Sequence, residues 1–222
     1  KSHDLWFHID GSWGGSVMLS NKHRKLLKGC KESDSFAWCA HKMMGVPLMC
    51  TVILMKDKDV LKNINDVPST DYLFHGEKMD LGLYSLQCGR RTDSIKLWLT
   101  WKYFGDIGYE KRIDRLFDLA KYSESKVESS RLFKMVSPVE SLNVCFQIQP
   151  EELNQGEWNT FTKKVRNRLI DQGEIMVNYA NIGDISCIRL IIVNFNLRKH
   201  HLDTFFESLE IISKEILKEL KN

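Results

Sequence analysis

Alternating apolar and polar positions predict strands along much of the chain. The first strand shows the pattern clearly, because Leu5, Phe7 and Ile9 share one face and the residues between them share the other. Leu142, Val144 and later residues alternate in the same way. In chain order, the expected strands cover residues 5–10, 35–39, 50–56, 141–149, 174–179 and 187–193.

A helical apolar period separates these strands. Expected helices cover residues 21–29, 94–104, 109–128, 158–172 and 200–220, with a short helix or turn at 57–65. Gly29 and Gly105 are expected to end helices. The apolar face of the last helix contains Leu202, Phe205, Phe206, Leu209, Ile212 and Ile216. The order strand, helix, strand, strand, helix after residue 141 is typical of a compact α+β unit, which places a domain boundary near residues 125–140.

Composition limits the classes of protein to consider. The chain has 222 residues, of which 43% are hydrophobic and 27% charged, as in globular proteins. The net charge of +3 is small and scattered, which argues against nucleic acid as a partner. No apolar run approaches the ~20 residues of a membrane span. The six cysteines form no CxxC pair, so reduced thiols in the cytoplasm are expected. A strand directly after Lys1 to Asp4 suggests the C-terminal part of a longer protein.

One lysine lies in an apolar stretch. Trp38 precedes the pair His41-Lys42, and Met43-Met44-Gly-Val-Pro-Leu48 follows it. An ammonium is costly to bury without a partner, and burial lowers the pKa of a lysine until its amine becomes a nucleophile for carbonyl groups. A lysine in an ordinary surface loop is the alternative.

Asp10 ends the first strand and precedes Gly11-Ser-Trp-Gly-Gly15. Ligands bind at strand ends in open α/β sheets. One interpretation is an aspartate that forms a turn or caps a helix. The other is a buried carboxylate that faces the protonated ring nitrogen of pyridoxal phosphate, with glycines that let a flat cofactor approach the backbone.

Arg189 interrupts the apolar strand 187–193 and shares a face with Cys187 and Ile191. An arginine there requires an anion, and its planar guanidinium binds a carboxylate through two hydrogen bonds. An internal salt bridge or an edge position is the alternative. His41 is either a contact to the cofactor or a histidine whose hydrogen bonds are satisfied within its loop.

Together these residues resemble the group II pyridoxal-phosphate-dependent amino acid decarboxylases, especially the glutamate and cysteine sulfinate decarboxylase branch. LWFHIDGSWGGSVMLSNKHRKLLKG is similar to the family's strand that ends in the aspartate at the ring nitrogen. DSFAWCAHKMMGVPL is similar to its Schiff-base lysine motif. YLFH, SLQCGRRTDSIKLWLTWKYFGDIGYEKRID and NVCF follow in the family's order, so the resemblance covers nearly the whole chain.

The resemblance implies an α/β fold of the type I, aminotransferase-like class. Residues 1–125 would form the C-terminal part of the large domain that binds the cofactor, and residues 126–222 the small C-terminal domain. The implied cofactor is pyridoxal 5'-phosphate, joined to Lys42 as a Schiff base.

Position by position, the resemblance also implies the other site residues. Asp10 would pair with the ring nitrogen, and Ser12 falls where the family has an alanine against the ring. His41 would lie near the phosphate and the imine. Arg189 falls where the family binds a carboxylate of the substrate.

The implied function is decarboxylation of an acidic amino acid, namely glutamate, cysteine sulfinate or aspartate, by a cytoplasmic homodimer that uses no metal. Three departures are visible: Cys39-Ala40 replaces a more polar pair, residues 74–80 form a shorter segment than in relatives and lack a tyrosine as proton donor, and the family's N-terminal half is absent. The alternative is a catalytically incomplete fragment or pseudoenzyme that acts as an assembly or interaction module.

Overall fold

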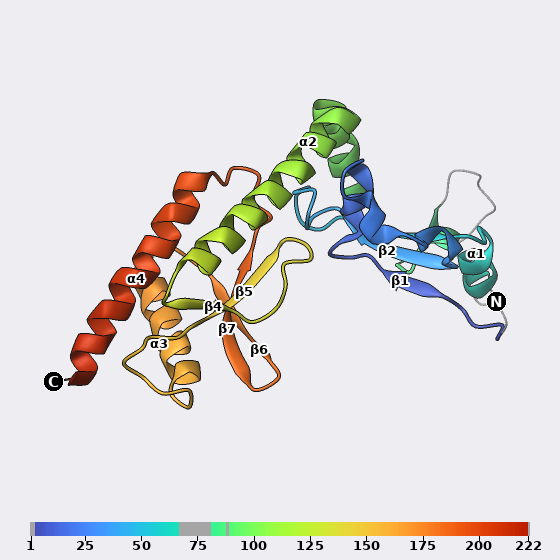
Figure 1. Ribbon diagram of the computed structural model, residues 1–222. Coiled ribbons are helices and arrows are strands. Elements are labelled where there is room, and N and C mark those ends of the chain that lie inside the picture. Colours follow the sequence, from blue (N-terminus) through green and yellow to red (C-terminus); the bar gives the residue numbers. More distant parts are fainter. Residues whose placement is uncertain (1–2, 67–80, 88, 222) are drawn as a thin grey trace. The chain divides into compact units, whose positions relative to one another are not determined.

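The computed structural model describes residues 3–66, 81–87 and 89–221 (Figure 1). The shortened segment 74–80, which lacks the tyrosine expected of a proton donor, and Cys88 lie outside these ranges. The chain forms two compact units, Lys1–Ile113 and Asp114–Asn222. The division between them falls inside helix α2 (Asp93–Ser129), upstream of the predicted domain boundary at residue 125, which stays a prediction.

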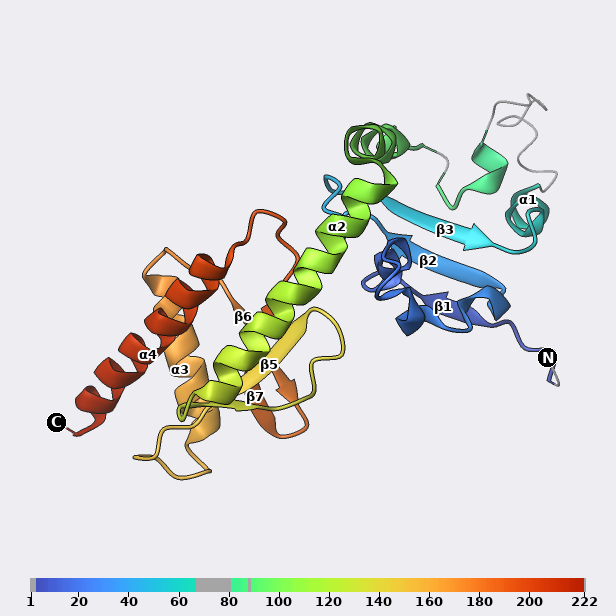
Figure 2. The same cartoon turned by 45° about the horizontal axis from the view of Figure 1, so that its top comes forward.

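The first unit contains a three-stranded sheet in the order β1-β2-β3, which Figure 2 shows side by side. Its strands are β1 (His8–Asp10), β2 (Ser35–Cys39) and β3 (Thr51–Met55). β1 and β2 are parallel, whereas β2 and β3 are antiparallel. The parallel pairing places the carboxyl ends of β1 and β2 at the same edge of the sheet.

The predicted helix at 21–29 is wrong. The chain between β1 and β2 forms the 3-10 turns η1 (Gly15–Leu19), η2 (Arg24–Leu27) and η3 (Cys30–Glu32). η2 buries none of its residues completely, and of the four only Leu27 packs in part against the core, which is too little apolar contact to stabilise a longer helix. Gly29 adopts the left-handed conformation (φ 91°) that suits its predicted role as a stop.

The remaining elements of the first unit are short. Helix α1 (Val60–Asn65) lies within the predicted 57–65 segment, and the 3-10 turn η5 (Gly82–Tyr84) follows. In α2 the backbone is non-helical at Gly105 (φ 65°, ψ 177°), which confirms the predicted break there.

Gly11 and Gly15 hold the turn after β1 against β2. A Cβ on Gly11 would lie 2.3 Å from Cζ of Phe36 and 2.9 Å from the carbonyl oxygen of Ala37. A Cβ on Gly15 would lie 2.9 Å from Cε1 of the same ring. The absence of a side chain at these two positions therefore makes room for the protein's own Phe36, and the expectation that the glycines admit a cofactor stays a prediction.

We expect Gly11→Ala to lower the free energy of unfolding by about 2 kcal/mol, because both the ring and the backbone must shift. Gly14→Ala is the matched control, since nothing lies within 4 Å of its Cβ and its φ of −88° suits alanine. It should change stability by less than about 1 kcal/mol. Urea unfolding followed by tryptophan fluorescence measures both. Equal losses in the two variants would contradict this explanation.

The second unit contains an antiparallel sheet in the order β4-β5-β7-β6. Its strands are β4 (Phe133–Met135), β5 (Asn143–Ile148), β6 (Asn178–Ile182) and β7 (Ile185–Ile191). β4 was not predicted, and β6 begins after the predicted start at residue 174. Both strands are defined by pairing with a neighbour, β4 with β5 and β6 with β7.

Helices α3 (Trp158–Asp171) and α4 (Lys199–Lys221) lie on one face of this sheet (Figure 1). The ring of Phe146 on β5 contacts Phe205 and Phe206 of α4 at centroid separations of 6.4 and 5.6 Å. All six predicted apolar residues of α4 are buried, which confirms its amphipathic face. Within the described ranges, no helix has both the length and the apolar character needed to cross a membrane.

Candidate active site

Asp10 and Lys42 meet at one edge of the first sheet. Asp10 is the last residue of β1, and Lys42 follows the end of β2 in a turn where its N–H donates to the carbonyl of Cys39 (3.1 Å). Because β1 and β2 are parallel neighbours, both side chains lie beyond the same edge. The positive charge of Lys42 is among the influences that lower the pKa of Asp10, so the two groups are near enough to interact.

Ser12 organises the carboxylate of Asp10. Its backbone N–H donates to Oδ1 of Asp10 (3.0 Å), and its hydroxyl donates to the same oxygen. The hydroxyl bond is the largest influence that holds the pKa of Asp10 below its ordinary value, and the N–H bond and the charges of Lys42 and His8 act in the same direction. No hydrogen bond from the described residues reaches Oδ2. Asp10 is exposed, so the expected burial of its carboxylate is wrong for the described part of the chain. The residue forms a turn and also keeps one oxygen available.

Lys42 itself is exposed, whereas the apolar residues after it are buried. Met43, Met44 and Val46 are 0%, 1% and 2% exposed. The expected burial of the amine is therefore wrong for the described part of the chain: the apolar side chains are part of the core, whereas the lysine is exposed. No hydrogen bond or salt bridge ties its amine to the described residues, so the amine is accessible.

His41 is fixed to the start of β3. Its Nδ1 lies 3.0 Å from the carbonyl oxygen and 3.1 Å from the amide nitrogen of Cys50. It donates to the first or accepts from the second, according to its tautomer. This is the satisfied histidine of the simpler interpretation, and its role toward a cofactor stays a prediction. Ala40, before it, is fully buried, and Cys39 contacts Oγ1 of Thr51 at 3.4 Å.

Arg189 lies in the second unit, on the inner strand β7, opposite Cys145 on β5 and Asn178 on β6. Phe146, the neighbour of Cys145, points toward α4, so alternation places Cys145 and Arg189 on the opposite face of the sheet. Arg189 is half-buried, and no hydrogen bond or salt bridge joins it to the described residues. The structure groups Asp10, Ser12, His41 and Lys42 in the first unit, and the relation of Arg189 to them stays a prediction.

A thiol pair beside Arg189 was missed from the sequence. A hydrogen bond from Cys187 and the charge of Arg189 lower the pKa of Cys145 to about 7. The same bond and burial raise the pKa of Cys187, whose Sγ also lies 3.4 Å from the carbonyl oxygen of Ala180. Strand periodicity placed Cys187 on the face of Arg189, but only the pairing register brought Cys145 there from another strand.

We expect this pair to release its first proton near pH 7. Because the pKa of Cys145 in the folded protein is below its ordinary 9.0, the stability it adds is fully present above pH 9.0 and is lost as the pH falls through about 7. The raised pKa of Cys187 lowers the stability of the folded protein, and so opposes the contribution of Cys145, only above pH 9.0. Thiolate absorbance against pH measures the step. Cys145→Ser should remove it and Cys30→Ser should retain it; a step unchanged in Cys145→Ser would refute the assignment.

The residues of the first unit fit pyridoxal phosphate by their chemistry. The cofactor's aldehyde requires an accessible amine, which Lys42 supplies. Its protonated ring nitrogen requires an ionised carboxylate, and the hydrogen bonds from Ser12 keep Asp10 in that form while one oxygen stays available. Both groups lie at one edge of a sheet, as a single flat ligand requires.

Comparisons with known proteins agree with this fit. Residues 1–149 match the model of the pyridoxal-dependent decarboxylase conserved domain. The chain is 33% identical to human acidic amino acid decarboxylase GADL1 over 231 residues, which cover 97% of this chain and 44% of that protein. It is 34% identical to mouse cysteine sulfinic acid decarboxylase over 230 residues, which cover 97% of this chain and 47% of that protein.

A solved structure supports the fold. The crystal structure of mouse CSAD superposes with a TM-score of 0.86 at 32% identity, over 96% of this chain and 46% of that one. The predicted α/β class, the type I fold of pyridoxal-phosphate enzymes, is thereby confirmed. The chain spans less than half the length of the curated relatives it matches.

Proposed function

Because the chain belongs to the pyridoxal-dependent decarboxylase family, we propose that the complete protein decarboxylates an acidic amino acid, namely glutamate, cysteine sulfinate or aspartate. The observation that carries the proposal is the meeting of Asp10 and Lys42 at the shared edge of β1 and β2. The acidic class of substrate is supported by relatives named acidic amino acid and cysteine sulfinic acid decarboxylases.

Each residue has a distinct proposed task. When bound, pyridoxal phosphate accepts the electron pair released as carbon dioxide leaves the substrate. Lys42 supplies the amine that holds the cofactor as a Schiff base. Asp10, kept ionised by Ser12, holds a proton on the ring nitrogen. Ser12 would lie against the ring, and His41, whose Nδ1 is held by Cys50, would present its other ring nitrogen to the cofactor.

Arg189 is proposed to bind a carboxylate of the substrate. Its guanidinium is half-buried and makes no hydrogen bond or salt bridge with the described residues, which leaves its forked donors for a ligand. We expect Arg189→Lys to raise KM for the acidic substrate about tenfold or more, because an ammonium cannot form the paired hydrogen bonds. Steady-state kinetics measures the change. An unaltered KM would contradict this role.

The function is tested by carbon dioxide release from the complete protein supplied with pyridoxal phosphate. Glutamate, cysteine sulfinate and aspartate are compared with phenylalanine and tyrosine. Faster release from at least one acidic substrate supports the proposal, and an equal rate with an aromatic one contradicts it. If the folded protein neither acquires the visible absorption of the bound cofactor nor releases carbon dioxide, the alternative of a pseudoenzyme or assembly module is favoured.

We also propose a cytoplasmic homodimer. Leu5, Trp6 and Phe7 precede β1 and are 77%, 54% and 48% exposed, an apolar stretch of the kind that a partner surface covers. The described cysteines are free thiols, as in a reducing compartment. Sedimentation of the complete protein would reveal the dimer, and a monomer at micromolar concentration would oppose it.

A further inference from the structure

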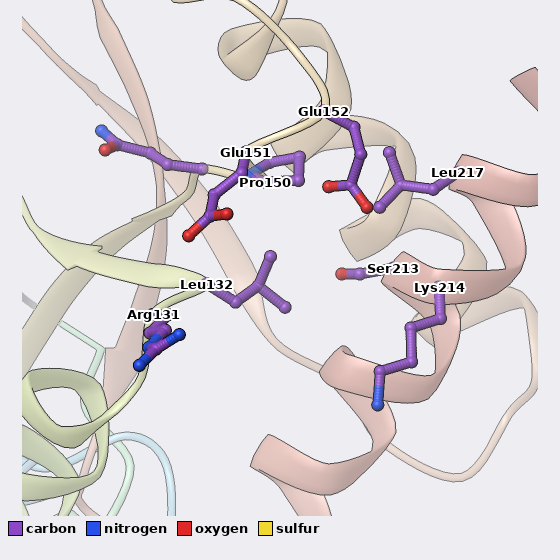
Figure 3. Close-up of a pocket in the computed structure, with 9 residues that line it drawn as sticks. Arg131, Leu132, Pro150, Glu151, Glu152, Ser213, Lys214 and Leu217 are labelled. Carbon is purple, nitrogen blue, oxygen red and sulfur yellow. The ribbon is translucent and has the colours of Figure 1, made fainter.

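A cavity of about 430 Å³ lies within the second unit, between α4, the segment before β4 and the segment after β5 (Figure 3). This volume is in the range of sites for small molecules. Its apolar lining is Leu132, Pro150 and Leu217. Its polar lining is Arg131, Gln149, Glu151, Glu152, Ser213 and Lys214.

Ser213 points an unsatisfied hydroxyl into this cavity. The residue is 1% exposed, and its buried Oγ has no hydrogen-bond partner among the described residues. Figure 3 shows the hydroxyl directed into the open space beside Leu132. A buried helical serine commonly donates to the carbonyl four residues earlier, as Ser123 does to Leu119 (3.0 Å). Leaving a buried hydroxyl unsatisfied is costly, so this hydroxyl has hydrogen-bonding capacity that a polar group entering the cavity would satisfy.

Charges of both signs surround this hydroxyl without neutralising each other. Glu151 and Glu152 lie on one side of the cavity in Figure 3, and Arg131 and Lys214 on the other. All four are exposed, and none forms a hydrogen bond or salt bridge with the described part of the chain. A ligand with one charge would meet attraction on one side and repulsion on the other. A ligand with both charges meets attraction on both sides.

We propose that this cavity binds a small zwitterion, an ammonium and an acid group joined by a short aliphatic chain. The ammonium lies toward Glu151 and Glu152, the acid group toward Arg131 and Lys214, and the hydroxyl of Ser213 bonds to one polar end. The aliphatic chain covers the apolar lining.

This ligand class has a counterpart in the proposed reaction, and the link rests on that proposed function. When an acidic amino acid loses its α-carboxylate as carbon dioxide, a proton takes its place, and the amine and the side-chain acid remain. The product is therefore a zwitterion of the proposed class, and the cavity that would sense it belongs to the second unit, whereas Lys42 and Asp10 belong to the first.

The test is calorimetric titration of the complete protein, without pyridoxal phosphate, with 4-aminobutyrate as the probe. Butylamine and butyrate carry the same chain with one charge each, and they should bind about tenfold more weakly or not at all. Binding at any other place, including the proposed active site, survives a change at Ser213. The part of the 4-aminobutyrate binding that Ser213→Ala weakens is therefore assigned to this cavity.

Ser213→Ala should weaken that part of the binding about tenfold and, in the absence of probe, raise Tm by about 2 °C, because it deletes an unsatisfied hydroxyl. Glu152→Gln and Arg131→Gln should each weaken binding without this rise. Ser123→Ala is the matched control: it removes a satisfied helical serine hydroxyl, so Tm should fall and binding should stay unchanged.

Absence of 4-aminobutyrate binding, or equal binding by the original protein and Ser213→Ala, would overturn the proposal. Butyrate or butylamine binding as tightly as 4-aminobutyrate would overturn the zwitterion class. The titration records binding and not turnover. If the protein binds the probe in this cavity but releases no carbon dioxide, the binding site is supported and the proposed function is contradicted. If it releases carbon dioxide but does not bind the probe, the proposed function is supported and the binding site is contradicted.

Discussion

Lys42→Ala should abolish the visible absorption that the cofactor has when joined to the protein's amine, and it should lower the rate of decarboxylation by about a thousandfold or more, equivalent to about 4 kcal/mol of barrier. The physical reason is that Lys42 supplies an accessible amine at the sheet edge that also carries Asp10. Absorption spectra with added pyridoxal phosphate and single-turnover kinetics measure the two effects.

Lys56→Ala is the matched control for this variant. Lys56 is also exposed, and it follows β3 in the same unit, but it lies away from the carboxyl ends of β1 and β2. Its replacement should leave the spectrum and the rate unchanged. A visible band that persists in Lys42→Ala with the original intensity would refute the assignment of the amine and the mechanism that depends on it.

Asp10→Asn should lower kcat about a hundredfold or more while changing cofactor affinity less, because a neutral amide cannot stabilise a proton on the ring nitrogen. The hydroxyl and the N–H of Ser12 hold the pKa of Asp10 below its ordinary value. A carboxyl with a depressed pKa loses its charge only as the pH falls through that lowered value. The acid limb of the rate profile at mildly acidic pH should therefore belong to another group.

Asp57→Asn provides the control for this prediction. Asp57 accepts the N–H of the residue two positions later (2.9 Å), as Asp10 does, but it does so in the turn after β3. Any effect of disturbing such a turn would appear in both variants, whereas an effect on the ring nitrogen appears only in Asp10→Asn. Equal kcat values for the two variants would show that the carboxylate has no chemical role.

Local patterns were sufficient for the elements that carry their own signal. β2 was predicted with the bounds observed, and α3 and α4 were predicted to within about a residue at each end, because each has a complete apolar face. The break at Gly105 could also be predicted from the sequence, since glycine tolerates the positive φ found there. The motif order likewise named Asp10 and Lys42 before their strands were known to be parallel neighbours.

Two strands that lack a clear pattern in their own sequence were missed or predicted at the wrong position. β4 has three residues, too few for a period, and it is recognisable only by its pairing with β5. β6 was set too early because its position depends on the hairpin at Gly183-Asp184, which pairs Ile182 with Ile185. That glycine with positive φ is a hairpin signal, and it was available in the sequence.

The sequence by itself determined the family, the cofactor chemistry and most helices, because motifs and periodicity are properties of neighbouring residues. Tertiary structure alone decided which distant groups meet: Cys145 beside Arg189, Phe36 against Gly11, and the unsatisfied hydroxyl of Ser213 in its cavity. Strand register and helix packing bring such groups together, and a shift of one residue in register would turn each strand side chain to the opposite face. No pattern along the chain encodes that choice locally.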